Sequence, residues 1–156
     1  MKVMNILHDS VVDGPGLRTV VFFAGCPHQC LGCHNPASWK MTNGVDMSVE
    51  EIFKEIKGNP LTDVTFSGGE PLIQAKGLVK LAQQIKAIHK NIWVYSGFTY
   101  EEIINGPNRY QKALLDYCDV LVDGRFILEE RDLSLTFKGS RNQRIIELNG
   151  GPYQLS

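Results

Sequence analysis

Three cysteines lie close together in the first quarter of the chain, at Cys26, Cys30 and Cys33. Their spacing, Cys-x3-Cys-x2-Cys, supplies three thiolates from one short loop. An iron–sulfur cluster held entirely by protein takes four cysteines, so three cysteines predict a 4Fe-4S cluster with one iron left open. An open coordination position is typical of a reactive metal site, whereas a closed shell of ligands serves structure. The spacing therefore predicts a centre at which chemistry takes place.

Zinc and disulfide bonds are the other common uses of such cysteines. Zinc could take His34 or the distant Cys118 as its fourth ligand, although zinc ligands usually come as Cys-x2-4-Cys pairs set well apart. Residues 1–10 contain Asp9 and lack the apolar run of a secretory signal, so we expect a cytoplasmic location. Thiols stay reduced there, which favours metal binding over disulfides. The cysteines alone therefore do not decide between an iron–sulfur cluster and a zinc ion.

Composition limits the partners of the chain. With 156 residues we expect a single domain over 1–156, long enough to bury a core. The formal net charge of -1 lacks the basic character of a nucleic-acid-binding protein. The longest apolar run, residues 20–24, is far too short to span a bilayer. We therefore expect neither a nucleic-acid partner nor a membrane.

Strands and helices alternate along the sequence. Capping boxes at Ser48–Glu51 and Thr99–Glu102 mark two helix starts. The apolar residues within 74–90 recur at helical spacing and predict a third helix. A further helix is predicted over 109–116, and strands over 17–24, 63–67, 92–95, 119–122 and 144–148. Such alternation predicts an α/β fold with a mainly parallel sheet.

An unusual sequence follows each of the first four predicted strands. These sequences are Gly25 with the cysteine loop, Gly68-Gly69-Glu70-Pro71, Ser96-Gly97 and Asp123-Gly124. The carboxyl ends of parallel strands meet at one edge of the sheet, where α/β proteins bind their ligands. We therefore expect all four sequences to surround one ligand-binding cavity at this edge of the sheet.

The Gly68-Gly69-Glu70-Pro71 sequence has no phosphate-loop spacing and no lysine, so a nucleotide cradle is not expected. Two glycines let backbone carbonyls approach a ligand closely, and Glu70 adds negative charge. An ammonium group is the guest that this chemistry suits. A tight turn with Pro71 at the first position of a helix is the structural alternative.

Together, Cys26-x3-Cys30-x2-Cys33 and the glycine turn resemble the radical S-adenosylmethionine superfamily. The resemblance implies one 4Fe-4S cluster per chain, with S-adenosylmethionine bound to the open iron through its amino and carboxylate groups. One electron from the reduced cluster then splits the cofactor into methionine and a 5′-deoxyadenosyl radical, which abstracts hydrogen from a substrate. The protein positions the cofactor and excludes water, and no catalytic side chain is expected.

Further motifs narrow the resemblance. Asp13-Gly14-Pro15-Gly16-x-Arg18 is similar to the activases of glycyl-radical enzymes. Four other segments resemble the branch that activates anaerobic ribonucleoside-triphosphate reductase. They are Cys30-Leu31-Gly32-Cys33-His34-Asn35, Tyr95-Ser96-Gly97, residues 119–124 and Gly139-Ser140-x-Asn142-Gln143. This resemblance implies an abbreviated, open (β/α) partial barrel of the radical S-adenosylmethionine type. It also implies the large subunit of the reductase as partner and a low-potential electron donor such as a flavodoxin, and it leaves a homodimer open.

The resemblance assigns roles residue by residue. Cys26, Cys30 and Cys33 ligate three irons, and the Gly68, Gly69 and Glu70 turn holds the methionyl amino group. Gly32, Cys33 and His34 lie beside the cofactor. Gly32 departs from the wider superfamily, which often has an aromatic residue there, but the reductase-activating branch shares this glycine.

Other interpretations stay in view. Within the same chemistry the partner could be another glycyl-radical enzyme of the formate-lyase type, or the substrate a small molecule, as in a deazaguanine-forming synthase. From another class, the chain could be a non-catalytic iron–sulfur or zinc module. We expect His28 to shape the cysteine loop and Cys118 to be a small buried hydrophobe. Three arginines could contact the cofactor carboxylate or the partner, or form structural ion pairs with a buried aspartate such as Asp123: Arg18, Arg125 and Arg144.

Overall fold

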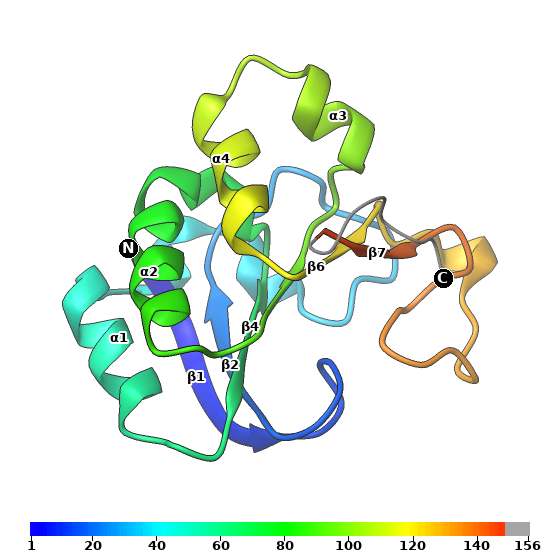
Figure 1. The fold of residues 1–156 in the computed structure, drawn as a ribbon. Helices are drawn as coiled ribbons and strands as arrows, with labels where there is room; N and C mark the ends of the chain where they lie inside the picture. The colour runs from blue at the N-terminus through cyan, green and yellow to red at the C-terminus, as the bar shows by residue number, and fades with distance from the viewer. Residues whose placement is uncertain (149–156) are drawn as a thin grey trace.

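A seven-stranded sheet forms the centre of the molecule (Figure 1), whose computed structural model describes residues 1–148. The strands lie in the order β3-β1-β2-β4-β5-β6-β7. Their bounds are β1 Lys2–Ser10, β2 Arg18–Phe23, β3 Val45–Asp46, β4 Asp63–Gly68, β5 Ile92–Tyr95, β6 Val120–Asp123 and β7 Arg144–Glu147.

The four central strands, β2, β4, β5 and β6, run parallel to one another. The outer pairings, β3 with β1, β1 with β2 and β6 with β7, are antiparallel. Strand β3 lies at one edge and β7 at the other, so the sheet stays open. The predicted α/β fold with an open sheet that is parallel through its centre is thus confirmed.

Four α-helices connect the strands: α1 Val49–Lys57, α2 Ala75–Ala87, α3 Tyr100–Asn105 and α4 Arg109–Tyr117. Both predicted capping boxes are present. At α1 the Ser48 hydroxyl accepts a hydrogen bond from the Glu51 N–H at 3.0 Å, and the Glu51 carboxylate accepts one from the Ser48 N–H at 3.2 Å. The shorter turns are 3-10 helices: η1 Pro36–Trp39, η2 Met41–Asn43, η3 Pro71–Gln74 and η4 Leu128–Glu130. No helix within residues 1–148 is long and apolar enough to cross a membrane.

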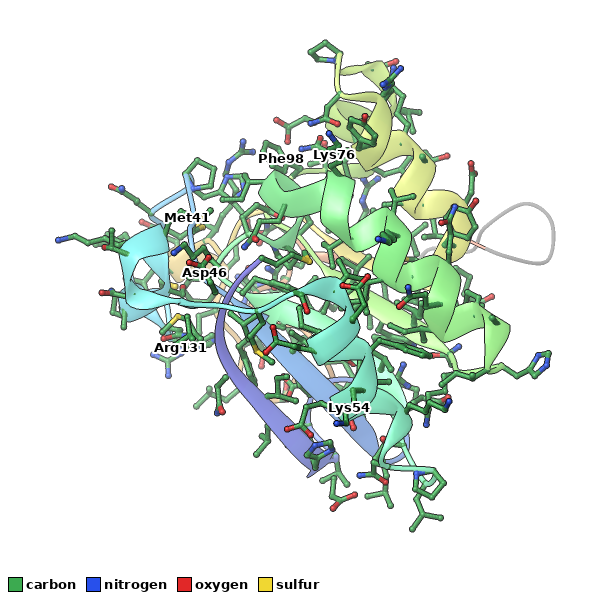
Figure 2. All side chains as sticks on the ribbon, turned by 90° about the vertical axis from the view of Figure 1, so that its left-hand side faces the viewer. Met41, Asp46, Lys54, Lys76, Phe98 and Arg131 are labelled. Carbon is green, nitrogen blue, oxygen red and sulfur yellow. The ribbon has the colours of Figure 1, made fainter. Side chains whose placement is uncertain are left out.

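Helices α1, α2 and α4 cover one face of the sheet, as Figures 1 and 2 show. The main core lies between these helices and the sheet, and it includes Phe23, Phe66, Leu81 and Leu121. On the other face, Trp93, Val120 and Val122 pack with Tyr95 and Phe137. Phe137 comes from the long segment between β6 and β7, so this segment, and not one of the helices α1, α2 and α4, packs on that face.

Candidate active site

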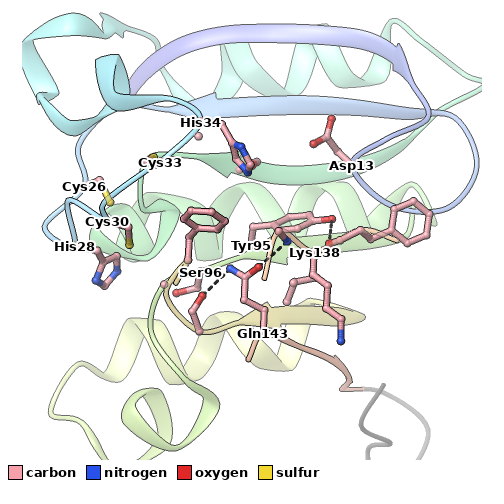
Figure 3. Close-up of a pocket in the computed structure, with 18 of the residues that line it drawn as sticks. Asp13, Cys26, His28, Cys30, Cys33, His34, Tyr95, Ser96, Lys138 and Gln143 are labelled. Carbon is pink, nitrogen blue, oxygen red and sulfur yellow. Dashed lines mark hydrogen bonds between the residues drawn. The ribbon is translucent and has the colours of Figure 1, made fainter. Parts of the chain in front are cut away.

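The carboxyl ends of the parallel strands form the expected cavity. Each of the four unusual sequences contributes residues to one cavity of about 400 Å³ (Figure 3). That volume lies within the range of small-molecule sites. The cavity opens on the sheet face opposite the helices, because Tyr95, Val122 and Phe137 line it. The lining includes these residues predicted from the sequence: Cys26, Cys30, Cys33, His34, Gly68, Gly69, Ser96, Gly97 and Gly124.

The three cysteines lie at one end of this cavity, and each is half-buried with a free thiol. Among residues 1–148 no three His, Cys, Asp or Glu side chains are arranged to hold one metal ion. A cubane binds each thiolate at a different iron, so its ligands need not converge on one point as zinc ligands must. Cys118, one of the fourth ligands considered for zinc, is buried in the helix-side core.

Backbone N–H groups are directed at two of the thiols. Burial raises the pKa of the Cys26 thiol, and hydrogen bonds from the backbone of His28 and Gln29 oppose that increase. The Asn35 N–H donates to the Cys33 sulfur at 3.4 Å. Hydrogen bonds to the sulfurs stabilise thiolate ligands and tune the reduction potential of iron–sulfur clusters. The donor set of this loop therefore fits a cluster with three cysteine ligands.

Gly69 lies where three backbone segments meet. The Gly25 N–H donates to the Ser38 carbonyl at 2.6 Å, and the Glu70 N–H donates to the Gly25 carbonyl at 2.7 Å. A Cβ on Gly69 would lie 2.4 Å from the Gly25 oxygen and 2.8 Å from the Ser38 oxygen. Only glycine permits this approach, which fixes the glycine turn against the start of the cysteine loop.

Glu70 lies below the wall of the cavity rather than in it. Its side chain is fully buried and accepts hydrogen bonds from His28, Ser96 and the Gly97 N–H. A fourth hydrogen bond comes from the Leu72 N–H, where Pro71 opens η3. The carboxylate therefore joins the cysteine loop, the glycine turn and the end of β5.

Gly32 and His34 occupy different places. Gly32 is exposed, has a φ of +79°, and does not line the cavity. His34 lines the cavity, and its ring lies 5.4 Å from the ring of Phe126.

Two of the three arginines form ion pairs. Arg144 pairs with the buried carboxylate of Asp123 and with Glu101, which confirms the structural interpretation for this residue. Arg125 pairs with Glu102 on the surface. Arg18 is 1% exposed and donates to neutral oxygens instead: the Thr65 hydroxyl, the Asn91 side chain, and the carbonyls of Pro15, Val64 and Asn91. Burial lowers the pKa of Arg18.

Sequence reasoning did not identify several apolar residues that line the cavity. Phe126, Leu133 and Phe137 all come from the segment between β6 and β7. The Tyr95 hydroxyl fastens this segment by donating to the Phe137 carbonyl at 2.8 Å. A usable signal was the position of Phe126, which follows directly after the Asp123-Gly124-Arg125 sequence.

Comparisons with known proteins agree with this geometry. Residues 12–146 match the family model described as a 4Fe-4S single cluster domain. An anaerobic ribonucleoside-triphosphate reductase-activating protein of Haemophilus influenzae is 36% identical over 154 residues, covering 93% of this chain and 97% of that protein. The protein of the same name from Vibrio cholerae is 38% identical, covering 86% of this chain and 90% of its own length. The one from Enterobacteria phage T4 is 33% identical over 86% of each chain.

Proposed function

The chain belongs to the family of anaerobic ribonucleoside-triphosphate reductase-activating proteins and carries a 4Fe-4S domain, and on this premise we propose that it generates the glycyl radical of such a reductase. The observation that carries the proposal is one cavity lined by three free cysteines, the glycine turn and the ends of β5 and β6. We propose that residues 1–156 act as one domain in the cytoplasm, with the reductase large subunit as partner.

When bound and reduced, the cluster supplies the electron that splits S-adenosylmethionine into methionine and a 5′-deoxyadenosyl radical able to take hydrogen from a glycine. Cys26, Cys30 and Cys33 would hold three of its irons, and the backbone N–H donors to the Cys26 and Cys33 sulfurs would stabilise the thiolates. The Gly68 and Gly69 backbone holds the methionyl amino group, with Glu70 fixing the turn from below.

The remaining wall serves to orient the cofactor and exclude water. His34 and Phe126 bring two rings to the cysteine end of the cavity, and the exposed Gly32 next to Phe126 adds no side chain. Leu133 and Phe137 add apolar surface from the other side. No acid or base is needed in this scheme, because the hydrogen is transferred to a carbon radical. A low-potential donor such as a flavodoxin supplies the electron, and a homodimer remains compatible with the scheme.

The test is anaerobic reconstitution with iron and sulfide, followed by reduction and addition of S-adenosylmethionine. We expect the electron paramagnetic resonance signal of the cluster to change on addition and 5′-deoxyadenosine to form. Incubation with anaerobic ribonucleoside-triphosphate reductase should then give a glycyl radical signal, and a formate-lyase should not. A cluster that is indifferent to S-adenosylmethionine, or a preparation that holds zinc instead of iron, would leave only a non-catalytic module.

A further inference from the structure

A histidine of the cavity lining, His28, forms a buried pair with Glu70, which lies behind the lining. The His28 Nε2 lies 2.7 Å from the Glu70 Oε1, and the two side chains are 5% and 0% exposed. His28 belongs to the cysteine loop, between Cys26 and Cys30, whereas Glu70 belongs to the glycine turn after β4. The pair thus joins the loop proposed to hold the cluster to the turn proposed to hold the cofactor.

The pattern of donors fixes the direction of this hydrogen bond. The Gly97 N–H donates to Oε1 at 2.7 Å and the Leu72 N–H donates to Oε2 at 3.0 Å. Backbone N–H groups can only donate, so both carboxylate oxygens are acceptors. His28 therefore donates from Nε2, and the Ser96 hydroxyl, at 3.0 Å from both oxygens, completes the set.

The end of β5 is shaped to hold the imidazole in this position. A Cβ on Gly97 would lie 2.4 Å from the His28 Cδ2, so any larger residue would displace the ring. The imidazole ring and the Phe98 ring pack in a T-shaped arrangement, with centroids 4.6 Å apart and planes at 75°. Packing and hydrogen bonding thus confine His28 to one orientation, which is what a positioning residue requires.

We propose that His28 and Glu70 are positioning residues that lock the cysteine loop, which would hold the cluster, onto the glycine turn, whose backbone would hold the amino group of the cofactor. This inference rests on the proposed function. Neither side chain needs to touch S-adenosylmethionine: Glu70 does not line the cavity, and the Nε2 of His28 is engaged by Glu70. Their contribution is to hold two backbone segments in register.

The test measures cofactor binding separately from cluster assembly. His28→Leu keeps all three cysteines, so after reconstitution we expect near-normal iron content and a near-normal signal from the reduced cluster. The S-adenosylmethionine concentration that half-completes the change in this signal should rise at least about tenfold, since a buried hydrogen bond to a charged group is lost. His28→Gln should restore it to within about threefold, because an amide N–H can replace Nε2–H as donor.

A matched control exists at the opposite end of the sheet. His8 also lies beside a glutamate, with its Nε2 3.7 Å from Glu55, but its side chain is 34% exposed and is not part of the cavity lining. His8→Leu should leave the titration unchanged. If His28→Leu titrates like the wild type, or if His28→Gln is as weak as His28→Leu, the positioning role is wrong.

Glu70→Gln provides a second variant for the case in which His28→Leu takes up no iron. The carboxylate of Glu70 now accepts hydrogen bonds from the N–H groups of Leu72 and Gly97. In the variant the NH2 group of the amide would face one of these donors, so that hydrogen bond would be lost. Normal iron content with weakened cofactor binding would support the lock, and a wild-type titration would overturn it. In the double variant the two losses should not add, because each single change already breaks the same contact. A wild-type protein that shows no response to S-adenosylmethionine would refute the proposed function instead.

Discussion

Replacing Gly69 by alanine tests how closely the glycine turn and the cysteine loop are fitted. The new Cβ would lie 2.4 Å and 2.8 Å from two backbone oxygens, those of Gly25 and Ser38. Backbone atoms cannot rotate away as a flexible side chain can, so the turn and the loop must separate. Overpacking of this kind costs about 1–3 kcal/mol. For a chain of this size each kcal/mol lowers Tm by roughly 2–4 °C, so we expect a decrease of about 2–12 °C.

The catalytic consequence should exceed the loss of stability. Displacing reacting groups by about 1 Å can cost about a hundredfold in rate. We therefore expect Gly69→Ala to form 5′-deoxyadenosine about a hundredfold more slowly, although its three cysteines are intact. Thermal unfolding of the cluster-free protein and product formation by the reconstituted protein are the two assays.

Gly58→Ala is the control for this prediction. Gly58 caps α1 with an ordinary φ of -66°, and a Cβ there would meet the Lys54 carbonyl at 3.3 Å. We expect its Tm to stay within about 2–4 °C of the wild type, equivalent to about 1 kcal/mol, and its rate to be unchanged. The reasoning is refuted if Gly69→Ala behaves like Gly58→Ala in both assays.

Three further predictions concern iron, buried charge and helix capping. Cys30→Ala should lose the cluster and 5′-deoxyadenosine formation, whereas Cys118→Ala should keep normal iron content; iron analysis that finds them alike would contradict the ligand set. Arg18→Met removes a buried guanidinium together with its five hydrogen bonds. The free energy of unfolding, measured with denaturant, should fall by about 3 kcal/mol. The affinity of this variant for S-adenosylmethionine should not change, and a selective loss of binding would point to a contact with the cofactor. Ser48→Ala removes the cap of α1 and should cost about 1 kcal/mol, seen as a Tm about 2–4 °C lower, with unchanged iron content.

The central part of the fold could be predicted because its signals are local. Short apolar runs identified β2, β4, β5 and β6, with glycines on both sides of the first, and the capping boxes located the starts of α1 and α3. Parallel pairing then followed from the alternation of strands and helices. Placing the cysteine loop and the glycine turn at one edge needed no knowledge of side-chain packing, since it depends only on strand direction.

The edge strand β7 was predicted over 144–148 and lies at Arg144–Glu147, but the other side of the sheet, β3 and β1, was not predicted. Strand β1 was missed because its residues, Lys2–Ser10, mix polar and apolar types and only Val3 and Ser10 are buried. Strand β3 has two residues, too few for any periodic pattern. The helix expected over 74–90 begins at Ala75, after the 3-10 turn that Pro71 opens, and ends at Ala87. His89 adopts a φ of +62°, which is incompatible with continuing the helix.

The sequence predicted which residues gather at the cavity, but it did not predict how deeply each side chain is buried. Glu70 was expected to offer its charge to an ammonium group, and its carboxylate instead meets hydrogen-bond donors from three segments. A carboxylate this deep must be satisfied by the protein, and only the folded chain shows which groups do so. His28, expected only to shape the loop, is the partner that carries this connection into the cysteine loop.

Gly32 explains why the aromatic residue common before the last cysteine is missing here. Its φ of +79° suits glycine, and a Cβ at this position would lie 2.8 Å from the Leu128 side chain. A large ring would therefore strain the backbone and displace Leu128. Phe126 lies 3.4 Å from the same point and lines the cavity beside the ring of His34. The segment after β6 thus brings an aromatic surface to the cysteine end, so the loss of an aromatic residue at position 32 does not leave the cavity without one.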